Sequence, residues 1–217
     1  MKLKHRITMM FRALGWRIPD RLLDRDTRNM RCVAETLGPD DVVIDLGAHI
    51  GNAAIEFSMF AKRVYSFEPN PVVFTKLQSQ TKRYKNISIY NRAIADRNGF
   101  IDLFFERGKN GNFFEGSTIM SGKTNVGYKN RISVQTVDIC EFVESLEHGP
   151  ICIKMDIEGA EYLVLERLMD SGMIHRIDKV YVECHIDRIP NLTISKERVL
   201  EKARKLGVLD KIDLNWH

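Results

Sequence analysis

The sequence predicts an α/β protein with a doubly wound, mostly parallel sheet, a β-hairpin insertion and an N-terminal helical segment. Short apolar runs such as Val42–Leu46 are typical of strands in a parallel sheet that is covered on both faces. The first two runs are each followed by a turn and a helical pattern, which indicates repeated β-α units. We expect a helical extension over residues 1–39 and one α/β domain over residues 40–217, since this length suits a single core.

The N-terminal segment is basic and amphipathic. Residues 1–31 carry nine Lys or Arg and three Asp, more than the whole net charge of +4. Pro19 ends one helical pattern, and Asp20 is placed to cap a second short helix through Met30. Such a segment could bind an anionic partner, namely a phosphorylated substrate, nucleic acid or a membrane surface. We favour a helix that packs on the domain or on a second subunit with its charges in water. Its apolar face consists of Ile7, Met10, Phe11 and Leu14.

Cysteine spacing and hydropathy indicate a cytoplasmic protein without a transmembrane segment. No apolar run is long enough to span a bilayer, and Arg12 interrupts the apolar part of the N-terminus, so a secretory signal is not expected. The four cysteines have no C-x-x-C spacing, which favours reduced thiols over a zinc site or a disulfide framework. They are Cys32, Cys140, Cys152 and Cys184.

The stretch DVVIDLGAHIG predicts a strand over residues 41–47, a tight turn and a helix over residues 51–61. Of the three glycines in a dinucleotide fingerprint only Gly47 is present, because His49 and Asn52 stand at the other two places, so NAD is disfavoured. The pattern D-x-G-x-x-x-G suits S-adenosylmethionine, which has no pyrophosphate. Asp45 could accept a hydrogen bond from the ammonium of its methionine part, and amides of the turn could hold its carboxylate. A turn that binds nothing is the alternative.

The next β-α unit supports the nucleoside interpretation. A strand over residues 63–68 ends at Glu68, 23 residues after Asp45, and a helix is expected over residues 71–83, capped by Asn70. An acidic residue about 20 positions after the glycine turn is placed to accept hydrogen bonds from ribose hydroxyls. Glu68 therefore predicts the ribose end of the site.

The middle of the chain predicts one more parallel strand and an insertion. Residues 86–95 are expected to form a third strand whose end, residues 91–96, lies near the adenine. Residues 100–105 and 132–137 predict an antiparallel hairpin. The glycine-rich loop over residues 107–130 is either a lid that faces the substrate or a mobile surface loop; it contains Phe113 and Phe114.

Two later strands carry polar residues at their carboxyl ends. The strand over residues 150–157 has Lys154 and Asp156 two apart, so both side chains project from one face. Burying this pair is costly unless it is partnered, and we expect Lys154 to form an ion pair with a neighbouring acid. The strand over residues 178–185 ends in Glu183 and His185, which also share a face.

Four strands thus deliver five polar residues to one edge of the sheet, where open α/β sheets bind their ligands. Asp138, with Glu141 three residues later, is placed to cap a short helix before the strand over residues 150–157. Another helix begins at Gly159, after this strand. A last helix over residues 195–206 and a final strand over residues 208–216 complete the fold. The five polar residues are Asp45, Glu68, Asp156, Glu183 and His185.

Five segments in this order resemble the FkbM-type family of S-adenosylmethionine-dependent methyltransferases: VVIDLGAHIG, VYSFEPNP, NRAIADRNG, IKMDIEGAE and VYVECH. The resemblance covers roughly residues 40–186, and IKMDIEGAE is its most specific part. It implies a class I methyltransferase (Rossmann-like) fold that makes residues 40–217 the S-adenosylmethionine-binding domain. It also implies O-methylation of a hydroxyl on a sugar, glycan or natural product, so the partner is a small-molecule or saccharide acceptor.

The resemblance and the residues together give a set of expected cofactor contacts. Asp45, Gly47 and Gly51 match the cofactor loop of the family, Glu68 matches its ribose acid, and His49 stands where we would expect Asn. The signature after the strand over residues 150–157 is matched by Asp156, Glu158, Gly159 and Glu161. The expected cofactor-binding residues are Asp45, Gly47, Ala48, His49, Gly51, Asn52, Glu68, Pro69, Asn91, Ala93 and Asp156.

The residues expected to be catalytic are Asp156, Glu183 and His185, and two mechanisms compete for them. In one, His185 is the general base, oriented by Glu183 or Asp156. In the other, Asp156 and Glu183, with His185 as a further candidate ligand, bind Mg²⁺ or a similar hard ion that lowers the pKa of the hydroxyl. A purely structural role for His185 is the third interpretation.

Two other classes of function remain open from the sequence. A nucleic-acid methyltransferase would use the basic N-terminus, but the remainder of the chain carries a charge of −2, so nucleic acid is not the expected partner. A non-catalytic module would bind S-adenosylmethionine through Asp45 and Glu68 without needing Asp156 or His185.

Overall fold

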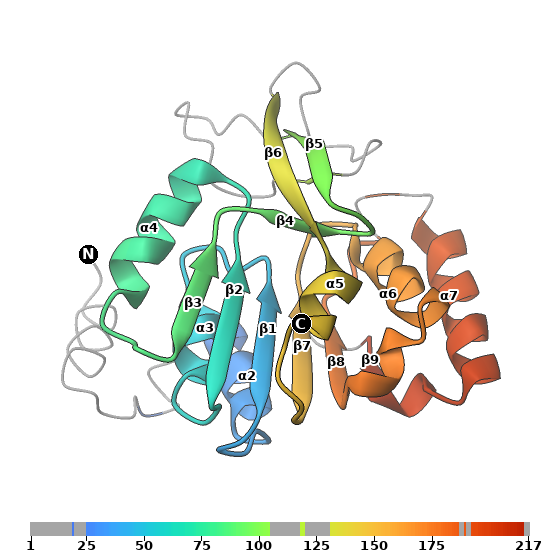
Figure 1. Ribbon diagram of the computed structural model, residues 1–217, viewed down its shortest axis with the longest axis horizontal. Helices are drawn as coiled ribbons and strands as arrows, with labels where there is room; N and C mark the ends of the chain where they lie inside the picture. Colours follow the sequence, from blue (N-terminus) through green and yellow to red (C-terminus); the bar gives the residue numbers. More distant parts are fainter. Residues whose placement is uncertain are drawn as a thin grey trace.

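The computed structural model describes residue 19 and residues 25–104, 118–119, 131–186, 189 and 192–214 (Figure 1). Its α-helices are α2 Arg25–Ala34, α3 Asn52–Phe57, α4 Pro71–Thr81, α5 Ile139–Glu144, α6 Glu161–Asp170 and α7 Leu192–Leu206, and its short 3₁₀ helices are η2 Met173–Arg176 and η3 Leu209–Lys211. Its strands are β1 Val42–Leu46, β2 Arg63–Phe67, β3 Ile87–Tyr90, β4 Ala93–Ala95, β5 Gly99–Phe104, β6 Arg131–Asp138, β7 Ile151–Met155, β8 Lys179–Val182 and β9 Ile212–Asp213.

The central sheet has the order β3-β2-β1-β7-β8-β9, and every neighbouring pair is parallel. The chain runs outward from β1 to β3, then returns to place β7 on the other side of β1. The direction of winding therefore reverses between β1 and β7, and ligands of doubly wound sheets bind at the carboxyl ends of the strands at such a point. The predicted doubly wound parallel sheet is confirmed.

Helices cover both faces of this sheet, with α2 and α3 behind the strands in Figure 1 and α5 and α6 in front. Successive side chains of a strand point to opposite faces. In β1, Ile44 and Leu46 accordingly join the hydrophobic cluster formed with α5 and α6, while Val43 joins the cluster formed with α2 and α3. All three are at most 1% exposed, so the apolar run that predicted β1 is buried on both sides.

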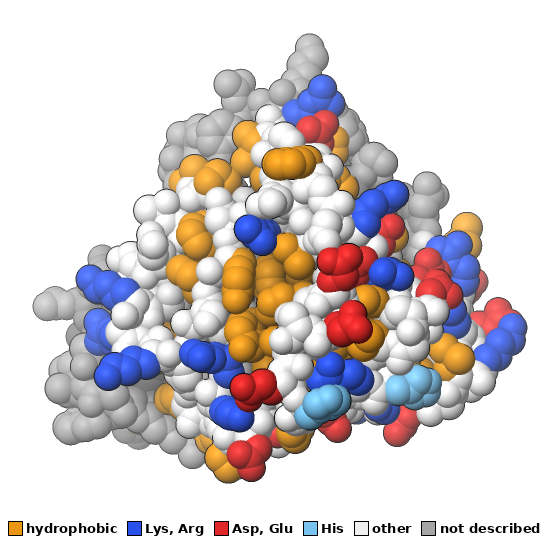
Figure 2. Space-filling view, in the orientation of Figure 1, with side chains coloured by type: hydrophobic (Ala, Val, Ile, Leu, Met, Phe, Trp, Pro, Cys, Tyr) orange, Lys and Arg blue, Asp and Glu red, His pale blue; other side chains and the backbone are white. Residues whose placement is uncertain are grey.

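Aromatic side chains cover the front of the strands between α4 and α5, where Figure 2 shows hydrophobic side chains gathered in the centre of the face. Phe67 and Tyr90 stack with ring centroids 4.7 Å apart. Phe142 of α5 meets both rings edge-on, at 4.9 and 5.9 Å. The short helix α5 thereby seals the front of β2 and β3 through ring packing.

A second, smaller sheet has the order β4-β6-β5, and it lies beyond the carboxyl ends of the central strands (Figure 1). The predicted hairpin is confirmed, because β5 and β6 pair antiparallel from Gly99↔Thr136 to Phe104↔Arg131. The prediction of one strand over residues 86–95 is wrong. Its first half is β3 of the central sheet, whereas its second half, β4, pairs in parallel with β6. Asn91 turns the chain between the two halves.

The N-terminal helix α2 packs on the domain. Val33 and Ala34 share a hydrophobic cluster with Ala53 and Phe57 of α3. Arg31 and Glu56 form an ion pair of 3.0 Å between these helices, with side chains only 3% and 1% exposed. The helix ends at Ala34 rather than Met30, because its last turn is buried against α3. The amphipathic pattern over residues 7–14 lies outside the described residues, and the boundary after residue 39 stays a prediction.

The C-terminal end of the sheet is shorter than predicted. In place of a strand over residues 208–216, the 3₁₀ helix η3 precedes a two-residue strand, β9, which pairs in parallel with β8. Helix α7 begins at Leu192, earlier than the predicted residue 195, and ion pairs Arg198–Glu166 and Lys202–Asp170 join it to α6. Of the predicted loop over residues 107–130, the structure describes Thr118 and Ile119. Within the described ranges, none of the helices has both the length and the apolar character that a membrane span requires.

Candidate active site

The loop after β1 approaches the end of β7 very closely. Gly47 and Gly51 have φ angles of 80° and 93°, which favour glycine. A Cβ atom on Gly47 would lie 1.8 Å from the carbonyl oxygen of Asp156, so a side chain cannot be accommodated. The amides of Gly47 and Ala48 both donate to the carbonyl of Phe67, at 3.1 and 2.9 Å. These two amides therefore position the loop, and any amide contact to the ligand's carboxylate must come from later residues of the turn.

Glu68 closes the loop from the neighbouring strand. Its carboxylate accepts hydrogen bonds from the amides of His49, at 2.9 Å, and Asn70, at 2.8 Å. Glu68 is 7% exposed, and this burial raises the pKa of its carboxyl to about 7, although the two amides oppose the shift. The side chain of Asn91 donates to the carbonyls of Glu68 and Pro69, at 2.8 and 3.1 Å. The structure thus brings these predicted cofactor residues together.

The other predicted cofactor residues frame the same edge. Asn52 is the first residue of α3, directly after Gly51, and Ala48 is buried in the loop. Ala93 is buried in β4, where it pairs with Thr136 of β6. The second sheet therefore begins immediately after the turn that Asn91 holds.

Lys154 joins the loop after β1 to the end of β7. Its ammonium lies 3.1 Å from Asp45 and 3.7 Å from Asp156, and it donates to the carbonyl of Gly47 at 2.8 Å. The predicted ion pair is confirmed. Burial by itself would lower the pKa of Lys154, but the charges of Asp45 and Asp156 together have the larger effect. The pKa is therefore raised overall, and the lysine stays charged. Asp45 is fully buried beneath the loop, and its contact with the ligand's ammonium stays a prediction.

The turn after β7 is held by Glu161, the first residue of α6. The buried carboxylate of Glu161 accepts hydrogen bonds from the amides of Ile157, at 3.1 Å, and Gly159, at 2.9 Å. Glu158, between them, has a φ of 57°, which costs a non-glycine residue about 1 kcal/mol or more. Thr118 donates to the carbonyl of Glu158 at 2.7 Å, so the chain between β5 and β6 contacts this turn.

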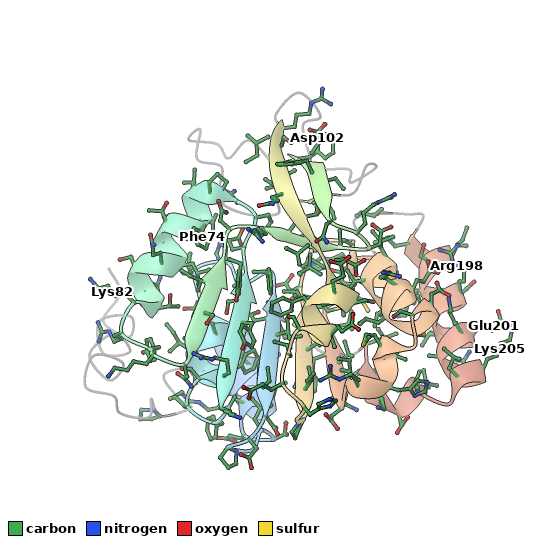
Figure 3. All side chains as sticks on the ribbon, in the orientation of Figure 1. Phe74, Lys82, Asp102, Arg198, Glu201 and Lys205 are labelled. Carbon is green, nitrogen blue, oxygen red and sulfur yellow. The ribbon has the colours of Figure 1, made fainter. Side chains whose placement is uncertain are left out.

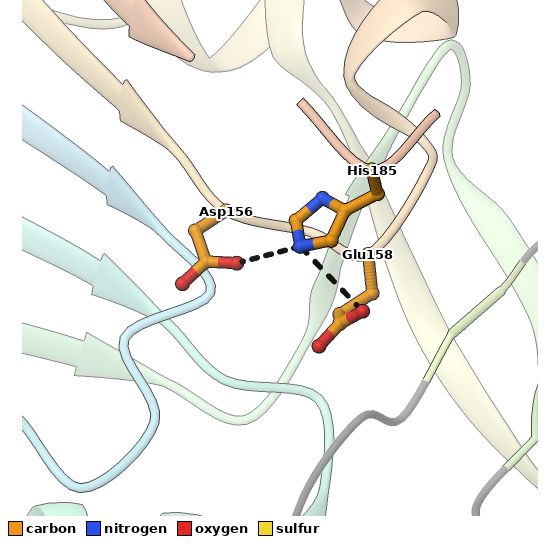
Figure 4. Close-up of side chains that lie close together, drawn as sticks. All are labelled: Asp156, Glu158 and His185. Carbon is orange, nitrogen blue, oxygen red and sulfur yellow. Dashed lines mark ion pairs between the residues drawn. The ribbon is translucent and has the colours of Figure 1, made fainter. Parts of the chain in front are cut away.

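His185 lies between Glu161 and the end of β7, as Figure 4 shows for its contacts to Asp156 and Glu158. Its Nδ1 is 2.9 Å from Glu161, and its Nε2 is 3.6 Å from both Asp156 Oδ1 and Glu158 Oε2. Glu183 is 3.9 Å from the same nitrogen. The structure therefore brings the three residues expected to be catalytic into one cluster with His185 at its centre.

This cluster holds more negative than positive charge, and the pKa values of His185 and Glu183 are both raised. Burial disfavours the imidazolium of His185, but the hydrogen bond to Glu161 and the charges of Glu161, Glu158 and Asp156 outweigh it, so the pKa of His185 is raised. Burial, followed by the charge of Asp156, also raises the pKa of Glu183. The site thus attracts a proton or another cation.

Two residues of the cluster had no role assigned from the sequence. Among the described residues, the group whose ligating atoms lie within 4.8 Å of one another is Asp156, Glu158 and His185, so Glu158 joins the expected ligands and Glu183 lies beside them. Glu161 contacts His185 directly. The only sequence signal for either was their presence in DIEGAE, since their approach to His185 depends on how the turn folds back.

Comparison with known proteins agrees with this geometry. A family model described as the methyltransferase FkbM domain matches residues 45–201. The chain belongs to this family. The predicted resemblance is therefore confirmed, and the FkbM family is one of S-adenosylmethionine-dependent methyltransferases. A search of curated proteins finds no match.

One solved structure, of an FkbM methyltransferase, supports the fold. The chain is similar to an FkbM methyltransferase from Methylobacillus flagellatus KT, with 17% identity and a TM-score of 0.51 over 76% of this chain and 38% of that one. It thus spans well under half of that protein. A precorrin-6y C5,15-methyltransferase from Geobacter metallireducens GS-15 has 14% identity and a TM-score of 0.44, over 82% of this chain and 70% of that one. An rRNA methylase from Streptococcus thermophilus has 11% identity and a TM-score of 0.43, over 84% and 80%. The architecture is the class I methyltransferase fold.

Proposed function

We propose that this FkbM-family protein is a cytoplasmic O-methyltransferase that transfers the methyl group of S-adenosylmethionine to a hydroxyl of a sugar, glycan or natural product. The single observation that carries the proposal is the position of Glu68. Its carboxylate meets the glycine loop at the point where the sheet reverses its winding, where a ribose would be bound. The four cysteines, all free thiols, support a reducing compartment.

The acidic cluster around His185 would receive the acceptor. In the reaction the acceptor oxygen attacks the methyl carbon in line with the sulfur, an O–C bond forms, and the C–S bond breaks with its electron pair on sulfur. S-Adenosylhomocysteine and a methyl ether result, and the hydroxyl proton leaves. In one mechanism His185 Nε2 accepts this proton; in the other, Mg²⁺ or a similar cation held by the carboxylates lowers the pKa of the hydroxyl. A non-catalytic module would have no use for this cluster.

Ligand-induced stabilisation tests the cofactor. S-Adenosylhomocysteine and S-adenosylmethionine are expected to raise the melting temperature, and NAD is not. A ligand at about 100 times its Kd adds roughly 2.7 kcal/mol of stability, or about 5–10 °C for a chain of this size. Glu68→Gln should lose most of this shift, because its neutral amide accepts hydroxyl hydrogen bonds more weakly. Stabilisation by NAD instead would contradict the proposal.

The chemical stability of the transferred methyl group shows whether the acceptor is a hydroxyl. With S-adenosylmethionine labelled in its methyl group, label transferred to a hydroxyl forms an ether that resists mild base. Label that mild base releases as methanol would indicate a carboxyl acceptor and would contradict O-methylation of a hydroxyl. Label in RNA alone would favour the nucleic-acid methyltransferase predicted as an alternative.

The raised pKa of Glu68 predicts a pH-dependent affinity. Because the pKa is about 7 in the ligand-free protein, the carboxyl is largely protonated at about pH 6. Ribose hydroxyls donate to the ionised form, so binding has to release this proton. Affinity for S-adenosylhomocysteine should therefore rise about tenfold between about pH 6 and pH 8 and then level off.

Calorimetry in two buffers of different ionisation enthalpy measures the proton release directly. Release at the lower pH is expected in the natural protein and not in Glu68→Gln. The stability of the ligand-free protein should change with pH in the opposite direction to the affinity. A carboxyl whose pKa is raised on folding stabilises the fold at low pH and loses this contribution as the pH rises through about 7. Affinity that does not change with pH would contradict the combination of a raised pKa at Glu68 and a contact between its carboxylate and the ligand.

A further inference from the structure

We propose that Asp156, Glu158 and His185 bind a divalent cation, and that this cation is where the acceptor oxygen is held. The catalytic part of this inference rests on the proposed function, whereas the binding part does not. The three side chains come from the turn after β7 and from the segment after β8, and their ligating atoms lie within 4.8 Å of one another. Carboxylate oxygens are ligands that Mn²⁺ and Mg²⁺ both prefer, whereas an imidazole nitrogen is a ligand of transition metals, so this mixed set suits Mn²⁺ better than Mg²⁺.

The orientation of His185 is the observation that points to a ligand. The ring is 4% exposed, and its Nε2 faces Asp156 and Glu158 at 3.6 Å, which is beyond hydrogen-bond distance. On its other side, Nδ1 lies 2.9 Å from Glu161. Glu161 also accepts hydrogen bonds from the amides of Ile157 and Gly159, so it is placed as an acceptor and Nδ1 carries the proton.

A protonated Nδ1 leaves a lone pair on Nε2, directed at the two carboxylates. A carboxylate that holds a histidine by one nitrogen, with the other nitrogen free to ligate, is the usual support of a metal-bound histidine. In neutral His185 this lone pair faces two negatively charged carboxylates inside a buried site. This arrangement is unfavourable by itself and becomes favourable when positive charge lies between the three groups, either as a proton on Nε2 or as a metal ion bound by all three.

The charges of the surroundings lead to the same conclusion. Four carboxylates, of Asp156, Glu158, Glu161 and Glu183, lie within 3.9 Å of the ring nitrogens of His185. The nearby ammonium of Lys154 is closer to Asp45, at 3.1 Å, than to Asp156, at 3.7 Å, so it pairs mainly with Asp45. An acceptor hydroxyl carries one proton and could satisfy one of the three ligands at a time. A divalent cation satisfies all three.

The distances suit such an ion with little movement. Ligands that lie about 2.1 Å from Mg²⁺ are about 3.0 Å apart at right angles, and the observed separations from Nε2 are 3.6 Å. The side chains of Asp156 and Glu158 are 30% and 18% exposed, so water or an acceptor oxygen can reach the remaining positions of the ion. With Nε2 engaged as a ligand, the hydroxyl proton leaves to solvent, and His185 is not the base.

Binding of Mn²⁺ to the full chain, freed of metal with a chelator, tests the proposal. Electron paramagnetic resonance should show one bound Mn²⁺ per chain, and pulsed measurements should detect the ¹⁴N coupling of a directly bound imidazole. Asp156→Asn and Glu158→Gln should each weaken binding at least about tenfold, and His185→Gln should remove the ¹⁴N coupling. Glu201→Gln, on the outer face of α7 in Figure 3, is a matched control that should bind as the natural protein does.

Glu161 acts through His185, so it is a positioning residue with a separate test. Glu161→Gln should weaken Mn²⁺ binding about 10–100-fold, since outer carboxylates of this kind contribute that much. If this buried variant fails to fold, Asp156→Asn and Glu158→Gln, whose side chains are partly exposed, still decide the question.

The outcomes separate the cation from the cofactor. A folded chain that binds S-adenosylhomocysteine but no Mn²⁺ overturns the cation site and leaves the proposed function standing. Mn²⁺ binding that Asp156→Asn and Glu158→Gln leave unchanged, or that shows no ¹⁴N coupling in the natural protein, also overturns it. A chain that binds Mn²⁺ with ¹⁴N coupling but no sulfur nucleoside supports the cation site and contradicts the proposed function.

Discussion

Replacing Gly47 with alanine should lower the melting temperature by about 8–20 °C and abolish binding of S-adenosylhomocysteine. The new Cβ would lie 1.8 Å from the carbonyl oxygen of Asp156 and 2.8 Å from its carbon. Both are backbone atoms at the end of β7, so the loop or the strand must shift. Changes of this kind belong to the class that costs about 4–5 kcal/mol, and each kcal/mol lowers the melting temperature of such a chain by about 2–4 °C.

Gly172→Ala is the matched control for this variant. Gly172 has a φ of 75°, close to the 80° of Gly47, but nothing lies within 4 Å of its added Cβ. It therefore carries the left-handed cost of about 1–2 kcal/mol without the clash. Equal losses of stability in the two variants, measured by thermal unfolding, would mean that conformation and not the contact with Asp156 makes glycine necessary at position 47.

Lys154→Met should destabilise the protein by about 3–5 kcal/mol, because it leaves the fully buried Asp45 without its partner. The variant also removes the hydrogen bond to the carbonyl of Gly47, so we expect weaker binding of S-adenosylhomocysteine in addition to the loss of stability. Denaturant unfolding measures the first effect, and calorimetric titration of the folded variant measures the second.

Two further variants show whether the buried charge is the cause. Asp45→Asn combined with Lys154→Met removes both charges, and it should recover at least half of the lost stability. Lys62→Met breaks an exposed pair with Glu147, whose side chains are 56% and 89% exposed, and should change stability by less than about 0.5 kcal/mol. A double variant as unstable as Lys154→Met alone would assign the effect to packing.

Much of the fold could be predicted from local patterns. The runs that became β1, β2, β7 and β8 are apolar because both faces of a parallel sheet are buried, and this signal does not depend on tertiary detail. The hairpin of β5 and β6 was also found. The break at Asn91 could not be, because the residues around it read as one continuous strand. What turns the chain there is the contact of Asn91 with the carbonyls of Glu68 and Pro69, which are distant in sequence.

The sequence predicted where the candidate site lies, but it did not predict most of the contacts within the site. The ends of parallel strands meet at one edge, so Glu68, Asp156 and His185 could be placed there from spacing alone. The partners of His185 could not, since Glu158 takes a left-handed conformation and Glu161 folds back from α6 to reach the ring. These contacts depend on the turn after β7, whose shape no period in the sequence encodes.

The close contact between Gly47 and the turn after β7 has an evolutionary consequence. Lys154 of β7 donates to the carbonyl of Gly47, and no side chain fits between Gly47 and the turn. A substitution that moves the backbone of one segment must therefore be matched by a change in the other. This half of the site is therefore a fixed platform. Thr118, which lies in the insertion between β5 and β6, contacts this platform by donating to the carbonyl of Glu158. We expect family members that methylate different acceptors to diverge in the insertion and to keep the platform unchanged.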